Sequence, residues 1–539
     1  MRYAGRLYSL LPNGNQLKFN AEILGKPQPV HFITGYVVAS AVHTWFNVPL
    51  SKHIMMKSKH IYSFISMLLL TALFAAGCSK KHTIDGGDTP GGPVTPPPGP
   101  VKSDMAMWLT RPDQTQLFKK QDISLLFNTG ANSNTTIGVD TTQTYQTIDG
   151  FGFALTGGSA YVISGLAEPA KTDLLNELFG TDGTHIAISY LRITLGASDM
   201  SASAYSYDDV PGDVTLANFS IDREKNDLIP VLQKIIAINP NIKILACPWS
   251  PPAWMKDNNS FTGGSLQAQY YDVYASYFVK YIQAMKANGI TIDAVTPQNE
   301  PRNAYNTPAM LFPAINEAAF IKKNLGSEFQ AAGLKTPLIC NDHNTDHPEY
   351  AKSILADDDA AKYVDGSAFH LYGGNINAIG PVHDAYPNKN LYFTEQATFA
   401  GGSFGGDLSW HVSNLIVGAT RNWCRNVLEW NLASDPNYGP HTSGGCSTCL
   451  GAVTIGTAVT RNVSYYIIAH ASKFVRPGAV RIASDQQSSL LNVAFKNTDG
   501  SKVLIVLNNT SGQQDFNIKF NGKMVNTTLA GGAVATYVW

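Results

Sequence analysis

Short apolar runs alternate with longer amphipathic segments through the middle of the chain. In the amphipathic segment that ends at Gly289, large apolar residues recur every three or four positions, which places them on one face of a helix. Strands that alternate with such helices are typical of a parallel sheet covered by helices. There are eight strand-like runs, and that number predicts a (β/α)8 barrel. The runs are TIDGFGFAL, IAISYLRITLG, IKILACPWS, IDAVTPQNE, TPLICNDHN, GSAFHLYGG, NLYFTEQA and NVLEWNLA.

The regions on either side of this alternating part read as strands and turns. Residues 104–145 contain short apolar stretches separated by polar turns, and residues 459–539 contain hairpin turns at NTDG and FNG. Neither piece is large enough to bury a core alone, so we expect them to pack together. The predicted fold class is therefore α/β, a TIM barrel over residues 146–458 with an attached β-sandwich built from the N-terminal and C-terminal segments.

The N-terminal part of the chain has the composition of a targeting segment. Residues 55–78 start with basic residues, continue as an apolar run and end at Cys78, which is the pattern of a bacterial lipoprotein signal peptide with a lipidated cysteine. A membrane-spanning helix is the alternative, although the apolar run is short for one. Residues 1–54 would then be a mis-assigned extension, and the Pro/Gly-rich residues 79–103 a linker. We expect a lipid-anchored protein of the bacterial cell envelope, periplasmic or on the cell surface.

The charge balance and the motifs narrow the possible ligands. The 39 basic and 40 acidic residues leave a formal charge of −1, so we expect no nucleic-acid partner and a neutral or weakly charged ligand. We find no phosphate-binding glycine loop and expect no cofactor and no metal, and we interpret His343 and His347 in HNTDH as polar loop residues. Cys446 and Cys449 could form a disulfide, remain thiols, or provide two ligands of a zinc site whose other ligands are not evident.

Two glutamates end strands that lie across a barrel from one another. Glu300 ends the fourth predicted strand, directly after Asn299, and Glu395 ends the seventh. Barrel enzymes hold their active sites at the carboxyl ends of the strands, and glycoside hydrolysis needs one carboxylic acid and one carboxylate on either side of the scissile bond. Each glutamate alone could instead cap a helix or pair with a lysine. Their joint placement favours the catalytic interpretation.

Several motifs carry a resemblance to a known family. The run TPQNEP, with ILACPWSPPAWMK before it and LYFTEQ after it, resembles glycoside hydrolase family 30, a clan A family that includes glucosylceramidases and β-1,6-glucanases. Further matching stretches follow in the family's order, so that the resemblance covers nearly all of residues 104–539. They are IDGFGFALTGGSA, LRITLGASDMS, YSYDDVPGD, GSAFHLYGG, VLEWNLASDPNYGP and YYIIAHASKFVRPGAVRI.

The resemblance implies a role for individual residues. Glu300 would be the acid/base and Glu395 the nucleophile of a retaining enzyme, with carboxyl groups roughly 5 to 5.5 Å apart. We then expect the pKa of Glu300 to be raised relative to that of Glu395. Arg192 could pair with a buried carboxylate or contact the nucleophile. The residues implied around the sugar are Asp199, Trp249, Asn299, His370, Tyr372 and Trp430.

The substrate is less sharply defined than the reaction. The opening MWLT resembles the β-1,6-glucanase branch of the family, which favours a β-1,6-linked glucan as the substrate. Glucosylceramide and xylan remain alternatives, because other members of the family act on them. A lipid-anchored carbohydrate-binding protein without activity is an alternative of another class, but a protein that only binds sugar has no reason to keep both Glu300 and Glu395.

Overall fold

The computed structural model describes residues 102–539. The extension of residues 1–54, the signal peptide of residues 55–78 with Cys78, and the linker up to residue 101 lie outside this range. Within residues 102–539, none of the helices combines the length and the apolar character that a bilayer crossing needs.

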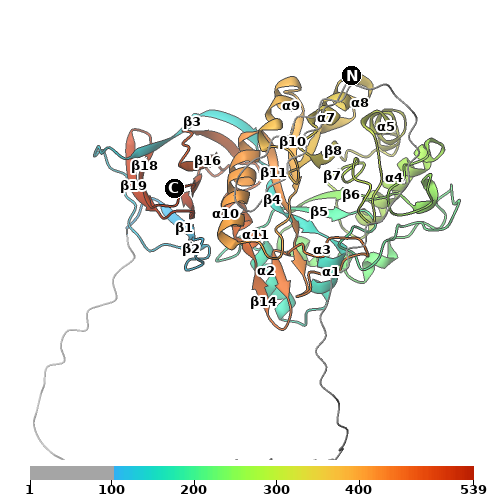
Figure 1. Cartoon of the computed structure of the whole chain (residues 1–539), viewed down its shortest axis with the longest axis horizontal. Helices are drawn as coiled ribbons and strands as arrows, with labels where there is room; N and C mark the ends of the chain where they lie inside the picture. Colours follow the sequence, from blue (N-terminus) through green and yellow to red (C-terminus); the bar gives the residue numbers. More distant parts are fainter. Residues whose placement is uncertain (1–101) are drawn as a thin grey trace, which may run out of the picture. The chain divides into compact units, whose positions relative to one another are not determined.

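Eight parallel strands close into a barrel, as the sequence predicts (Figure 1). Each of the eight predicted runs overlaps one of these strands, in the expected order, and β9 and β11 begin two residues before their runs. The strands are β4 (Gly150–Leu155), β5 (Tyr190–Thr194), β6 (Lys243–Cys247), β7 (Ala294–Val295), β8 (Leu338–Asn344), β9 (Val364–His370), β10 (Asn390–Glu395) and β11 (Cys424–Asn431).

Helices connect the strands and cover the outside of the barrel. The amphipathic segment with the clearest spacing forms α4, which ends just before Gly289, a glycine with φ of 78°. A left-handed conformation of this kind suits glycine at a helix end. The helices are α1 (Gly157–Ser164), α2 (Ala170–Phe179), α3 (Leu228–Ile238), α4 (Tyr271–Ala287), α5 (Ala314–Phe320), α6 (Gly326–Ala331), α7 (Pro348–Leu355), α8 (Asp358–Ala361), α9 (Gly380–Ala385), α10 (Phe404–His411) and α11 (Val463–Ser472).

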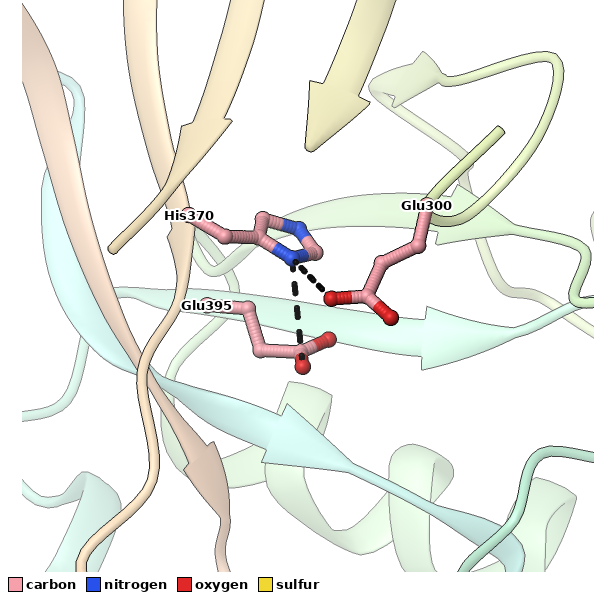
Figure 2. Close-up of side chains that lie close together, drawn as sticks. All are labelled: Glu300, His370 and Glu395. Atoms are coloured by element: carbon pink, nitrogen blue, oxygen red, sulfur yellow. Dashed lines mark hydrogen bonds and ion pairs between the residues drawn. The ribbon is translucent and has the colours of Figure 1, made fainter. Parts of the chain in front are cut away.

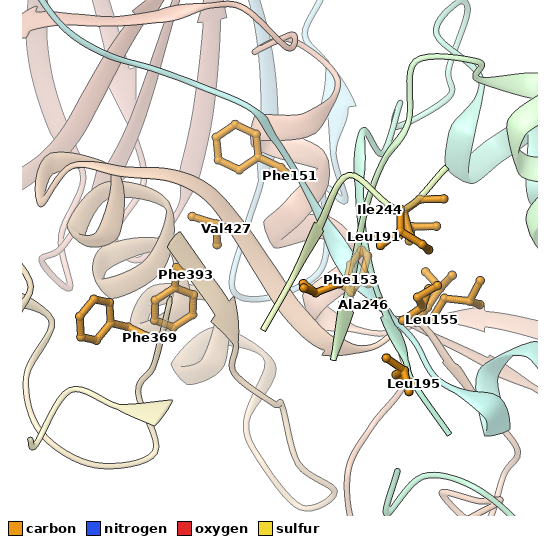
Figure 3. Packing of buried hydrophobic residues seen from close by; sticks show 14 of the residues in the cluster. Phe151, Phe153, Leu155, Leu191, Leu195, Ile244, Ala246, Phe369, Phe393 and Val427 are labelled. Atoms are coloured by element: carbon orange, nitrogen blue, oxygen red, sulfur yellow. The ribbon is translucent and has the colours of Figure 1, made fainter. Parts of the chain in front are cut away.

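Successive side chains of the barrel strands point in opposite directions, and both sets are largely apolar toward the amino-terminal ends of the strands. One set, including Phe153, Leu191 and Ile244, packs between the strands and the helices in the largest apolar cluster (Figure 3). The other set forms a separate buried cluster to which every barrel strand except β4 contributes one residue, and we call it the barrel floor. Its members are Tyr190, Leu245, Ala294, Ile339, Ala368, Tyr392 and Leu428.

The β-sandwich combines both ends of the described chain, as expected. Strand β3 (Thr135–Thr147) pairs with β18 through its first residues and with β15 through its later ones, so it connects the two halves of the sheet. The strand order is β19-β18-β3-β15-β16-β17-β20-β1-β2. The other bounds are β1 (Ala106–Thr110), β2 (Lys119–Lys120), β15 (Val480–Ser484), β16 (Leu490–Lys496), β17 (Lys502–Asn508), β18 (Gln514–Phe520), β19 (Lys523–Leu529) and β20 (Val534–Val538).

The border between barrel and sandwich lies later than residue 459, where we expected it. A small sheet of β12 (Ala433–Ser434), β13 (Val453–Ile455) and β14 (Val459–Arg461) leads into α11, whose buried residues join the largest apolar cluster, which also includes residues of the sandwich. Helix α11 also contacts the sandwich, because buried His470 is hydrogen-bonded through one ring nitrogen to Thr536 Oγ1 and through the other to Thr110 Oγ1, both at 2.8 Å. Residue 459 belongs to the barrel side, because β14 pairs with β13 and β13 pairs with β12, which directly follows β11.

Candidate active site

Six of the seven strands that contribute to the floor place a buried residue above it, two positions later in the chain; four of these six residues are polar, and the other two are Cys247 and Trp430. Side chains two apart on a strand point the same way, so these residues form a second layer above the floor, toward the carboxyl ends of the strands. All of them are buried. They are Arg192 after Tyr190, Cys247 after Leu245, Thr296 after Ala294, His370 after Ala368, Thr394 after Tyr392 and Trp430 after Leu428.

Glu300 lies just beyond the end of β7 and is only 7% exposed. Its backbone has φ of 43°, which is costly for a residue with a side chain, and its N–H donates to the carbonyl of Asp342 at 3.0 Å. The side-chain amide of Asn303 donates to Glu300 Oε2 at 2.7 Å. Two neighbouring segments therefore fix both the backbone and the carboxylate of Glu300.

Glu395 ends β10 and is 6% exposed. Arg192 donates to its Oε2 at 2.6 Å, and the hydroxyl of Tyr372 donates to its Oε1 at 3.0 Å. Glu300, His370 and Glu395 each place one side-chain nitrogen or oxygen within 4.8 Å of the others (Figure 2). The two carboxylates thus meet across the barrel mouth, close to the expected spacing.

Arg192 and Asp342 form the buried centre of the polar layer. Arg192 donates to Asp342 Oδ2 at 2.7 Å and to Asn299 Oδ1 at 2.6 Å, in addition to Glu395. It therefore makes both of the contacts that we considered for it, one with a buried carboxylate and one with the expected nucleophile. Asp342 also accepts hydrogen bonds from Thr394 Oγ1 at 2.6 Å and from Thr296 Oγ1 at 2.8 Å. Sequence reasoning missed Asp342. The available signal was its position near the end of the predicted fifth strand.

The charges around His370 reverse the expected order of the two glutamate pKa values. Burial alone would lower the pKa of His370, but the carboxylates of Glu395, Asp342 and Glu300 outweigh it and raise the pKa to about 9. Although burial acts to raise the pKa of Glu300, its hydrogen bond and charge interaction with His370 lower it to about 2. Burial raises the pKa of Glu395 despite the nearby His370 and Arg192. Our expectation that Glu300 has the higher pKa is thus wrong for the free protein, because a protonated His370 lies 3.3 Å from Glu300.

The residues expected around the sugar lie beside the two glutamates. The Trp249 and Trp430 rings pack together with centroids 5.4 Å apart, and the Arg192 guanidinium lies 4.7 Å from the Trp249 centroid. Asp199 is 5% exposed, and burial, followed by the charge of Glu395, raises its pKa to about 7. The carboxamide oxygen of Asn299 accepts a hydrogen bond from Arg192, which leaves the NH2 group of Asn299 for a ligand.

The structure shows the state of the cysteine pair and the places of the two histidines in HNTDH. Cys446 and Cys449 form a disulfide. His343 is only 7% exposed and belongs to β8, so our interpretation of it as a loop residue is wrong, because the strand runs further than expected; His347 precedes α7. The cluster of Glu300, His370 and Glu395 has the spacing of a cation site, but a cation there would compete with the protonated His370 and with Arg192 for the same carboxylates.

Comparison with known families decides the class of this site. The model of the glycosyl hydrolase family 30 TIM-barrel domain matches residues 148–475, and that of the family 30 beta sandwich domain matches residues 478–537. The chain belongs to glycosyl hydrolase family 30. It is a glycoside hydrolase, and this family 30 member has its barrel boundary near residue 475, in agreement with the packing of α11.

Relatives of this family 30 chain include enzymes of more than one specificity. An endo-1,6-beta-D-glucanase of Neurospora crassa is 36% identical over 71% of this chain and 84% of its own length. The lysosomal acid glucosylceramidase of Mus musculus is 30% identical over 73% of this chain and 81% of its own. The solved structure of the endo-beta1,6-glucanase BT3312 is 36% identical, covers 81% of this chain and 99% of that one, and superimposes with a TM-score of 0.76.

Proposed function

We propose that this protein is a retaining endo-β-1,6-glucanase in which Glu395 is the nucleophile and Glu300 the acid/base. The observation that carries the proposal is the pair of buried carboxylates within 4.8 Å of each other at the mouth of a family 30 barrel. Retaining glycosidases hold their two carboxyl groups about 5 to 5.5 Å apart, whereas inverting ones need about 6.5 to 9.5 Å to admit a water molecule. The spacing here supports direct attack by a carboxylate.

In the first step, Glu395 attacks the anomeric carbon and Glu300 protonates the leaving oxygen. Arg192 and the Tyr372 hydroxyl each hold one oxygen of Glu395, which orients the carboxylate and favours its ionised form. In the second step, water activated by Glu300 releases the sugar from Glu395. A low pKa of Glu300 does not hinder this second step, because an ionised carboxylate is then the base.

His370 provides the proton that the first step needs. Its Nδ1 lies 3.3 Å from Glu300 Oε1, and its pKa of about 9 keeps it protonated at neutral pH. In the free protein the proton stays on His370. When a sugar excludes water from the mouth, loss of solvation disfavours both charges, which raises the pKa of Glu300 and lowers that of His370, so that transfer of this proton gives a neutral acid and a neutral imidazole. Glu395 then keeps Arg192 as its cationic partner.

The β-1,6-glucan specificity rests on the relatives. The Neurospora crassa enzyme and BT3312 both bear the name of an endo-1,6-β-glucanase and are both 36% identical to this chain. The relationship to a glucosylceramidase supports glucosylceramide as a second candidate substrate. We further propose that Cys78 carries a lipid that anchors the enzyme to the cell envelope, where an oxidising compartment allows the disulfide to persist.

Hydrolysis of pustulan, a β-1,6-glucan, tests the proposal. The purified protein should release gentio-oligosaccharides from pustulan, and the product should first appear as the β-anomer in the proton NMR spectrum. Glu300→Gln and Glu395→Gln should each reduce the rate by at least about 1,000-fold. Glu349→Gln makes the same chemical change at an exposed site of α7 and should leave the rate unchanged.

The other outcomes distinguish the alternatives. Cleavage of glucosylceramide or of glucuronoxylan but not of pustulan would retain the mechanism and reject the glucan. Initial release of the α-anomer would reject retention. Binding of gentio-oligosaccharides without cleavage of any of the three substrates would favour a protein that only binds carbohydrate.

A further inference from the structure

A turn formed by residues 440–451, which contains the Cys446–Cys449 disulfide, lies along one side of the candidate site. Thr442 N–H donates to the backbone carbonyl of Asp199 at 2.8 Å, and Cys446 N–H donates to the carboxylate oxygen Oδ2 of the same residue at 3.3 Å. On its other side, the turn is paired with the segment that follows β10, where Ala400 N–H donates to the carbonyl of Thr448 at 2.8 Å. The turn therefore joins the segment that holds Asp199 to the segment that begins at Glu395.

Asp199 depends on this turn for its position. Its carboxylate is buried, and Oδ1 has no hydrogen-bond partner within the described residues. A buried polar atom without a partner is costly and marks a place for a ligand. Among residues 102–539, the contact from the Cys446 N–H is the one hydrogen bond to the Asp199 carboxylate, so a movement of the turn would release the carboxylate.

The two cysteines face different surroundings. Cys449 is 3% exposed and packs in one apolar cluster with Trp249 and Trp430, which form the neighbouring wall of the site. Cys446 is half-buried, and Ser447 and Thr448 between them are exposed. A small reductant can therefore reach the disulfide, whereas the three free cysteines of residues 102–539 are all buried.

We propose that the Cys446–Cys449 disulfide is a positioning element for substrate binding: it holds the turn against Asp199, so that the enzyme binds its sugar fully only in the oxidised state. This inference deepens the proposed function. Reduction by a dithiol would transfer two electrons and two protons to the disulfide and yield two thiols, while the dithiol becomes a disulfide. The sulfur atoms take no part in the hydrolysis itself.

The proposal predicts a local effect. The bridged residues are three apart in the sequence, and a disulfide across so short a loop constrains the unfolded chain little. We therefore expect the KM for gentio-oligosaccharides to rise about tenfold after reduction, the factor that the loss of one hydrogen bond provides. We expect kcat to change less than about twofold and the melting temperature to change little.

The experiment compares the full-length protein before and after treatment with dithiothreitol, together with the double variant Cys446→Ser/Cys449→Ser. Thiol titration under native conditions should show two additional thiols per treated chain. The double variant should have the raised KM without treatment and should not respond to dithiothreitol, which controls for effects of the reductant elsewhere. Complete reduction with an unchanged KM would overturn the proposal.

A second measurement separates this inference from the proposed function. Hydrogen exchange followed by mass spectrometry should show faster exchange in residues 196–201 and 440–451 after reduction, with no substrate present. If pustulan is not cleaved but this exchange increases, the proposed substrate fails and the positioning role stands. Unchanged exchange in both segments of a fully reduced protein would reject the positioning role whatever the substrate is.

Discussion

Arg192 is the residue whose loss should cost most, and the cost can be worked out from its contacts. It is fully buried and donates to Glu395 at 2.6 Å, to Asp342 at 2.7 Å and to Asn299 at 2.6 Å. Arg192→Met fills much of the same volume but removes the guanidinium from two buried carboxylates, which then share His370 as the nearby cation. Removing one partner of a buried ion pair costs about 3–5 kcal/mol of unfolding free energy.

A second substitution tests whether uncompensated charge is the cause. Asp342→Asn in the Arg192→Met background removes one of the two carboxylates that lost the guanidinium and should restore about 2–3 kcal/mol. Urea unfolding followed by tryptophan fluorescence and by circular dichroism measures each corner of the double-mutant cycle. Activity should stay low in both variants, because Glu395 loses the hydrogen bond and the charge of Arg192 in each. A loss below about 1 kcal/mol in the single variant, or strictly additive effects, would refute the reasoning.

Three further substitutions have expected outcomes. Asn303→Ala removes a donor to ionised Glu300 and should raise the pKa of Glu300 by about one pH unit, as measured by carbon-13 NMR titration of its carboxyl group; an unchanged pKa would contradict this. Tyr372→Phe removes a donor to Glu395 and should lower kcat by about 10- to 100-fold in steady-state assays, and an unchanged kcat would exclude the role. Burial lowers the pKa of His470 to about 3, whereas the pKa of histidine in the unfolded chain is about 6.5, so stability is lost as the pH falls below about 6.5. The free energy of unfolding, measured by urea titration, should drop by about 2 kcal/mol between pH 7 and pH 5. It should drop less in His470→Gln.

The sequence predicts the barrel and both glutamates because these signals are local. Each strand is a contiguous apolar run, and Glu300 and Glu395 stand directly at strand ends. Asp342 also stands near a strand end, but that position alone does not reveal its role, since its importance comes from Arg192 on β5 and Thr394 on β10, which only the closed barrel brings to it.

The protonation order failed for a related reason. The pKa of Glu300 depends on His370, and the pKa of His370 depends on carboxylates at the ends of three other strands. The separation of these residues along the sequence does not reveal which of them lie close together in the barrel. The border of the sandwich was misplaced because α11 packs on both units, and a single helix with two partners has no boundary signal of its own.

The barrel floor gives the site an electrical direction. The seven side chains of the floor close the barrel below the second layer, which contains Arg192 and His370. The second layer therefore has a poorly polarisable medium on one side and solvent on the other. Field lines avoid a low-dielectric wall and concentrate in the open mouth. Substitutions that enlarge or hydrate the floor should therefore weaken the potential felt by a sugar at the mouth without touching any residue that contacts it.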